Sequence, residues 1–99
     1  MNKPRVCSIE VSKHALARLR QRGLSHEVVP LVMEYGDRYY AGSGKIGYVY
    51  GARAAIRARK QFHQAPNDLN IAIVVSHGNL VVTAFHIHRR IPRHWRRSK

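Results

Sequence analysis

Two apolar segments late in the chain limit its fold most. Residues 70–76 and 80–88 are rich in β-branched and aromatic side chains, and His77-Gly78-Asn79 lies between them. This pattern is typical of two strands joined by a tight turn, so it predicts an antiparallel β-hairpin. A chain of 99 residues has room for one hydrophobic core. The remaining segments are therefore expected to pack with this hairpin in a single domain over residues 1–99.

Two helices are predicted ahead of the hairpin. Ser12 is a favourable N-cap for a helix over residues 13–22, which Gly23 ends. The buried stripe of this helix is expected to contain Ala15, Leu16 and Leu19.

The second helix is predicted to run from Ser25, as its N-cap, to Gly36. Glu27 in its first turn is favoured by the helix dipole. Pro30 is an objection, because proline removes one helical hydrogen bond and can kink the segment. The apolar residues at helical spacing are Val28, Leu31, Val32 and Tyr35.

The period of the pattern changes in the middle of the chain. Residues 38–41 and 46–50 are rich in Tyr and β-branched side chains and flank Gly42-Ser43-Gly44, which predicts a second hairpin. Residues 52–64 place alanines and apolar residues at helical offsets and predict a third helix, with a strand as the alternative. Residues 6–11 alternate loosely and fit a short leading strand.

The predicted order of elements is α-α-β-β-α-β-β, with the leading strand optional. Because the strands come in hairpins, we expect an α+β fold with an antiparallel sheet and helices on one face. The residues from about 89 to 99 contain no acid and are expected to form a basic tail. Shortening the chain after Ile91 is expected to leave the core folded.

Charge is the strongest indication of function. Eighteen Lys and Arg against five Asp and Glu give a formal net charge of +13 with neutral histidines. Most of the cations are Arg, whose planar guanidinium suits bidentate contact with phosphate. Nucleic acid is therefore the expected partner, and the alternatives are a soluble basic protein or a subunit covered by an acidic partner. The single Cys7 and the absence of a secretory signal or a membrane-length apolar stretch indicate a cytoplasmic protein.

A candidate catalytic group lies on the first predicted helix. His14, Arg18 and Arg22 recur every four residues and therefore share one face. A histidine moves protons near neutral pH, and an arginine stabilises negative charge on a phosphate in the transition state. This pairing suits RNA cleavage by internal attack of a 2′-hydroxyl. A solvated basic face is the alternative interpretation.

The last predicted strand carries a second group. His86 and His88 point to one face, where they are placed to meet phosphate or a base. They would also suit zinc, although the sequence supplies no obvious third ligand, and two solvated polar side chains are the plain alternative. Alternation assigns Val81, Thr83, Phe85 and Ile87 to the opposite, apolar face.

The other residues expected to contact nucleic acid are basic or aromatic. On the third helix and near the end of the chain, the candidates for phosphate contact are Arg53, Arg57, Lys60, His88, Arg89, Arg90 and Arg93. Aromatic side chains that can stack bases, or simply build strands, are Tyr39, Tyr40, Tyr48 and Tyr50.

Several short motifs resemble those of the domain-of-unknown-function family four-two-five-eight. They are Ser12-Lys13-His14-Ala15, Arg18, Arg22-Gly23-Leu24-Ser25, Gly51-Ala52-Arg53-Ala54-Ala55, Val74-Val75-Ser76 and Val81-Val82-Thr83-Ala84-Phe85. The resemblance extends from residue 12 to about residue 90. That family is similar to the RelE-like ribonuclease toxins, a superfamily grouped with barnase, EndoU and colicin endonucleases.

The resemblance implies a RelE-like, metal-independent endoribonuclease without a cofactor, and a small acidic antitoxin or immunity partner. It assigns catalytic positions to His14 and Arg18 on the helix and to Thr83 on the strand. His86 is the alternative strand contact, because alternation places it on the polar face. Because alternation separates Thr83 from His86, Thr83 joins His14 only through a bulge or a partly apolar working face. The alternative function is a non-catalytic nucleic-acid-binding module, such as an accessory protein of a mobile element.

Overall fold

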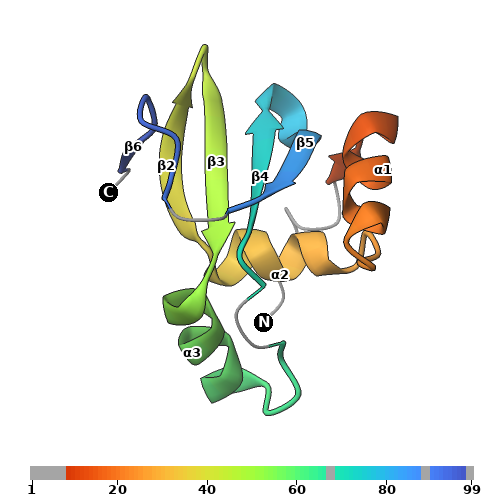
Figure 1. The fold of residues 1–99 in the computed structure, drawn as a ribbon, viewed down its shortest axis with the longest axis vertical. Helices are drawn as coiled ribbons and strands as arrows, with labels where there is room; N and C mark the ends of the chain where they lie inside the picture. Colours follow the sequence, from red (N-terminus) through yellow and green to blue (C-terminus); the bar gives the residue numbers. More distant parts are fainter. Residues whose placement is uncertain (1–8, 67–68, 88–89, 98–99) are drawn as a thin grey trace.

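The computed structural model describes residues 9–66, 69–87 and 90–97. Within these residues the chain forms three α-helices and one six-stranded sheet (Figure 1). The elements are β1 (Glu10–Val11), α1 (Lys13–Gln21), α2 (Val28–Tyr35), β2 (Asp37–Gly42), β3 (Lys45–Tyr50), α3 (Ala52–Gln61), β4 (Ile71–Ser76), β5 (Leu80–His86) and β6 (Arg96–Arg97). A 3₁₀ turn over His77–Asn79 joins β4 to β5.

The sheet is mixed, with the strand order β1-β5-β4-β3-β2-β6. The predicted hairpins β2–β3 and β4–β5 are both present, and β3 pairs antiparallel with β4. By contrast, β1 pairs parallel to β5, and β6 adds an edge strand antiparallel to β2. The α+β class is confirmed. The wholly antiparallel sheet and the predicted element order are corrected, because these two short strands are held by distant partners rather than by local turns.

The first helix begins as predicted. The Ser12 Oγ accepts a hydrogen bond from the Ala15 backbone N–H at 3.0 Å and donates one to the Val82 carbonyl at 3.1 Å. The Ser12 backbone N–H also donates to the Val81 carbonyl at 2.9 Å. Ser12 therefore both caps α1 and attaches its start to β5. Gly23 follows the helix at a φ of +72°, a conformation that favours glycine.

The second and third helices are shorter than predicted. α2 begins at Val28, so Pro30 lies in the first turn, where a backbone N–H has no acceptor within the helix. Pro30 is therefore no obstacle to α2. Ser25, the predicted N-cap, instead accepts a hydrogen bond in the preceding turn. α3 ends at Gln61, because Phe62 leaves the helical conformation. Across the described ranges, no helix is long and apolar enough to cross a membrane.

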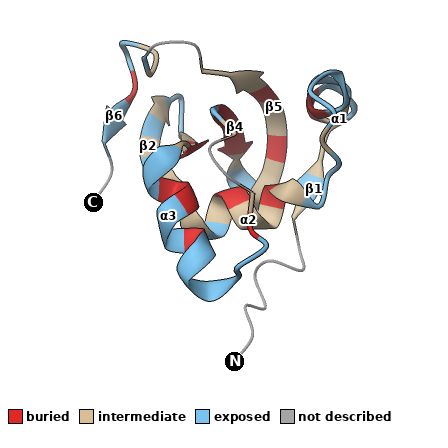
Figure 2. Ribbon diagram, turned by 60° about the horizontal axis from the view of Figure 1, so that its bottom comes forward, coloured by how far each residue is buried: buried red, intermediate tan, exposed pale blue. Residues whose placement is uncertain are grey.

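Each face of the sheet buries its own core. On one side, here called the helical face, all three helices pack against the sheet, as predicted, and Figure 2 shows buried residues in β4, β5 and the helices. The largest fully buried side chains are Tyr50, Leu19, Ile71, Ile73, Val29, Val32 and Val81. The opposite side, here called the Trp95 face, buries a smaller cluster of Val49, Ala72, Val74 and Trp95.

A β-bulge in β5 changes which side chains meet the helices. Val74 pairs with Thr83, whereas the next pair in the ladder involves Val81, so Val82 is an extra residue. Val81 and Ala84 consequently both join the core of the helical face. Thr83 remains with Val74 on the Trp95 face. The prediction that Val81 shares a face with Thr83 is wrong, because simple alternation does not count the extra residue.

Residues 90–97, near the end of the sequence, belong to the fold. Trp95 is 8% exposed and completes the core of the Trp95 face. A Cβ at Gly47 would overlap the Trp95 ring, so glycine permits this packing. The following strand, β6, pairs with Tyr39 and Tyr40 of β2. The expectation of a dispensable basic tail is corrected: shortening the chain after Ile91 would remove Trp95 and uncover this core.

Candidate nucleic-acid interface

A cleft of about 380 Å³ lies between α1 and the adjoining ends of β4 and β5. Its volume falls within the range of roughly 300–1,000 Å³ that is usual for ligand sites. The residues that line it are Arg18, Gln21, Arg22, Ile71, Ala84, Phe85 and His86.

The cleft forms because α1 lies alongside β5 (Figure 1). Ser12 attaches the start of the helix near the start of the strand, so the second half of α1 reaches the end of β5. Arg18 lies in the last turn of α1, and Arg22 caps the end of the helix one turn later, so both reach the cleft. His86 pairs with Ile71, whose side chain belongs to the core of the helical face, so His86 faces α1.

The lining combines cations with an imidazole and an apolar surface. Arg18 and Arg22 are exposed, and His86 is half-buried. Among the residues with described positions, no Asp or Glu lines the cleft or forms an ion pair with either arginine. Guanidinium groups in this position can donate paired hydrogen bonds to a phosphate. The arrangement therefore suits an anion, with a proton-transferring group beside it.

Two of the four residues predicted to be catalytic, Arg18 and His86, line the cleft. His14 is exposed and lies one helical turn before Arg18 on the same side of α1, outside the lining. Thr83 faces away, because it pairs with Val74 on the Trp95 face. The structure thus brings His86, and not Thr83, to the arginines of α1.

The cations of α3 lie elsewhere, because α3 packs against α2 and β3. Arg53 and Lys60 are exposed there. Arg57 connects parts of the fold: its Nη2 donates to the Tyr35 carbonyl at 2.6 Å and to Asp37 Oδ1 at 2.9 Å. Arg57 therefore attaches α3 to the junction of α2 and β2, a structural role that its sequence position did not reveal.

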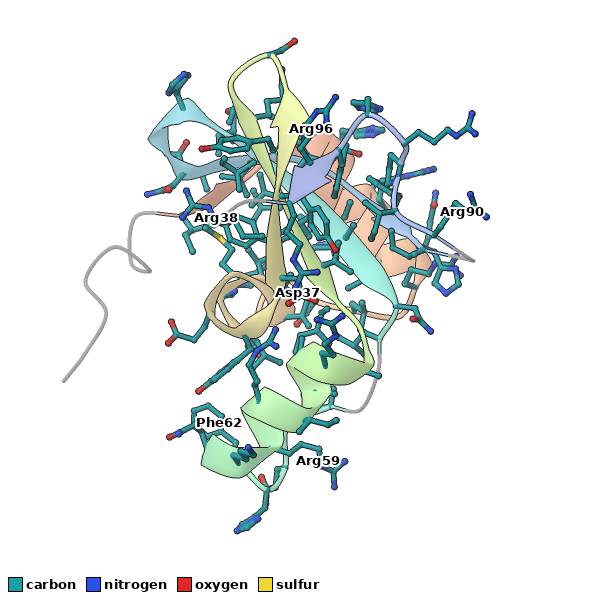
Figure 3. The ribbon with its side chains drawn as sticks, turned by 90° about the vertical axis from the view of Figure 1, so that its left-hand side faces the viewer. Asp37, Arg38, Arg59, Phe62, Arg90 and Arg96 are labelled. Carbon is teal, nitrogen blue, oxygen red and sulfur yellow. The ribbon has the colours of Figure 1, made fainter. Side chains whose placement is uncertain are left out.

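The remaining predicted contacts follow β5. Arg90 and Arg93 are exposed on the segment that leads to Trp95, and Figure 3 labels Arg90. His88 and Arg89 lie outside the described residues.

Comparisons with protein families, curated proteins and solved structures found no significant match. The resemblance to the family four-two-five-eight and to RelE-like ribonucleases stays a prediction.

The sequence also left open a zinc site at His86 and His88. In the part of the chain that the structure describes, no group of three or more His, Cys, Asp or Glu side chains lies close enough together to hold a metal ion. His88 is not in that part, so the pair itself is untested.

The four tyrosines of the first hairpin have different surroundings. Tyr50 is fully buried and its hydroxyl donates to the Pro66 carbonyl at 2.8 Å. Burial raises the pKa of Tyr50, and the positive charge of Arg59 partly opposes that rise. Tyr39 packs against Trp95, and Tyr48 against the core of the helical face. Tyr40 is exposed, which makes it the tyrosine best placed to stack on a base.

Four residues that line the cleft were not predicted there: Gln21, Ile71, Ala84 and Phe85. Gln21 follows Arg18 by three residues, so its helical spacing was a usable signal. Ile71 and Ala84 reach the cleft through the pairing of β4 with β5. No local sequence signal reveals that pairing register once a bulge interrupts it.

Proposed function

We propose that this chain binds RNA in the α1–β5 cleft and cleaves it as a metal-independent endoribonuclease. The observation that supports this most is that Arg18 and Arg22 share one cleft with His86, although they come from segments far apart in the sequence. The net charge of +13 favours a polyanionic substrate.

In this reaction the 2′-oxygen of the RNA attacks the adjacent phosphorus while the bond from phosphorus to the 5′-oxygen breaks. A base removes the proton of the 2′-hydroxyl, and an acid protonates the leaving 5′-oxygen. Arg18 and Arg22 hold the phosphate oxygens and stabilise the charge that develops on them. The products carry a 2′,3′-cyclic phosphate and a 5′-hydroxyl.

Two proton transfers need two groups, and the cleft supplies one of them directly. We assign His86 as the first of these two groups, because it lines the cleft. We assign the second to His14, which lies one turn from Arg18 on the same side of α1. The spacing in the sequence favours His14 as the main group, whereas the placement in the fold favours His86.

A second candidate function is a nucleic-acid-binding module without catalysis. Among the described residues, the lining of the cleft contains one histidine, His86, beside two arginines. Such a set can bind phosphate without moving two protons. The first proposal also includes a RelE-like character and a cytoplasmic location. It further includes a small acidic antitoxin as partner, because such a partner would cover the exposed cations.

The test is incubation of total RNA with the purified protein in the presence of a chelator. Cleavage is expected, with 2′,3′-cyclic phosphate ends, and an oligonucleotide with 2′-deoxyribose at the cut site should resist. His86→Ala should lower the cleavage rate by roughly 10²–10⁴-fold, the usual effect of losing a positioned proton donor or acceptor.

The matched control is His63→Ala, which changes an exposed histidine beyond the end of α3. RNA binding without cleavage would leave the binding module as the function. Cleavage that the chelator abolishes would overturn the metal-independent mechanism. Cleavage that survives His86→Ala but not His14→Ala would return the main role to the helix.

A further inference from the structure

A second basic surface lies on the edge of the sheet formed by β2 and β6. Its centre is Tyr40, which is 57% exposed. Among the described residues, only Ile56 and Phe62 are comparably exposed large hydrophobic side chains, and both belong to the region of α3. Tyr40 lies in β2, beside the edge strand β6, and its ring is open to a partner from solvent.

Two arginines lie on the same side of the sheet as Tyr40. Arg38 precedes Tyr40 by two residues in β2, and Arg96 is its direct partner in β6. Both arginines are exposed, and Figure 3 looks onto the edge where they project.

The neighbours of Arg96 confirm its orientation. Trp95 packs over Gly47 on the Trp95 face. The guanidinium carbon of Arg97 lies 5.9 Å from the ring centre of Tyr39, which packs against that same core. Because side chains alternate along an extended chain, Arg96 points to the helical face, with Tyr40.

The surface is positive as well as aromatic. In the described ranges, no carboxylate forms an ion pair with Arg38 or Arg96. Asp37, the acid of β2, lies 2.9 Å from Arg57 and 4.0 Å from Arg97 instead. No described carboxylate therefore neutralises Arg38 or Arg96, and both guanidinium groups are available to bind an anionic partner.

We infer that Arg38, Tyr40 and Arg96 bind a single-stranded segment of RNA, with one base stacked on Tyr40 and the backbone phosphates held by the arginines. An exposed ring between two cations suits a single strand, because the bases of a duplex are already stacked on each other. The inference rests on the proposed function for the choice of RNA. It adds the single-stranded form of the substrate and a contact away from the cleft, since β3 and β4 separate β2 from β5.

The test measures binding of a 2′-O-methyl oligonucleotide, which cannot be cleaved, as a single strand and as a duplex. Tyr40→Ala should weaken single-strand binding by about 5- to 150-fold, the usual effect of removing one stacked aromatic. Tyr40→Phe should keep most of the affinity. The matched control is Phe62→Ala, which removes a similarly exposed ring, at 53%, from the end of α3 and should change nothing.

Arg38→Gln and Arg96→Gln should each reduce the dependence of log affinity on log salt by about 0.7. If Tyr40→Ala binds the single strand with wild-type affinity, or loses duplex binding to the same extent, the inference is overturned. The proposal that RNA binds in the α1–β5 cleft would not be affected. Failure of the wild-type protein to bind either form would instead overturn the proposed function, and this inference with it.

Discussion

Helices α1 and α3 have similar sequences, and the fold uses them differently. Both are rich in Ala and Arg, and both bury small residues against the sheet: Ala15 in α1, and Ala54 and Ala58 in α3. Their outer faces differ. Arg18 of α1 lines a cleft that also contains His86, whereas Arg57 of α3 binds Asp37 and the Tyr35 carbonyl.

A run of arginines in the sequence indicates positive charge but does not show what that charge binds. Arg57 meets the Asp37 carboxylate and the Tyr35 carbonyl when α3 packs against α2 and β3, so its charge serves the fold. The second half of α1 docks beside the end of β5, where the described lining holds no acid. The role of the arginines on each helix therefore depends on which groups the neighbouring segments place next to them.

The largest expected effect is on folding. It compares a charge placed on the face of α1 that packs against the sheet with a charge placed on the solvent-exposed face of α3. Leu19→Asp in α1 places a charge at a position with no exposure and should unfold the domain, a loss of roughly 4 kcal/mol or more. Ile56→Asp in α3, at 60% exposure, should stay folded. Circular dichroism with thermal melting measures both. A folded Leu19→Asp would show that α1 is not docked as described.

The next effect is on RNA affinity. It distinguishes specific binding in the cleft from attraction to positive charge anywhere on the surface. The double variant Arg18→Gln/Arg22→Gln should lower RNA affinity by about 10- to 100-fold, because charge-assisted hydrogen bonds to phosphate are lost. Arg53→Gln/Lys60→Gln removes the same charge from α3 and should lower it by only a few-fold. Fluorescence anisotropy at constant salt compares them. Equal losses would mean that the cleft is no more than part of a diffuse basic surface.

A smaller effect concerns the stability role of α3. Arg57→Ala should destabilise the domain by about 1 kcal/mol, since its hydrogen bonds are strong but its side chain is partly solvated. For a domain of this size, that lowers the melting temperature by roughly 4–8 °C. Arg18→Ala should leave the melting temperature nearly unchanged. A severe drop in the melting temperature of Arg18→Ala would show that Arg18 stabilises the fold and is not a site residue.

The smallest effect is a change in pH dependence at Tyr50. Because burial raises its pKa in the folded state, the unfolded chain ionises first, at its ordinary value of about 10. Its contribution to stability is therefore complete below that pH and is lost as the pH rises through the folded-state pKa. Tyr50→Phe should remove this alkaline loss, and by losing the bond to Pro66 should also cost about 1 kcal/mol at neutral pH.

The matching variant in α3 is Arg59→Gln. The charge of Arg59 opposes the rise in the pKa of Tyr50, so its removal should raise that pKa further. Ultraviolet absorbance of the tyrosinate follows the titration. A downward shift would contradict the conclusion that the charge of Arg59 lowers the pKa of Tyr50.

Much of the local structure could be predicted from the sequence. Ser12 and Gly23 delimit α1, and the turn residues near Ser43 and Gly78 locate both hairpins, because caps and tight turns depend on a few neighbouring residues. The shared side of Arg18 and Arg22 followed from helical spacing alone. These features involve interactions between residues close in the chain, which the order of residue types largely determines.

The tertiary structure decided the rest. The bulge at Val82 placed Val81 on the same face as Ala84 and His86, because register is settled by packing across the whole sheet. Trp95 joined the core because Gly47, far away in the sequence, leaves room for its ring. The helices, the hairpins and the positive charge could all be predicted from the order of residue types. Which arginines meet a histidine and which meet a carboxylate was decided by contacts between distant segments, which no local pattern records.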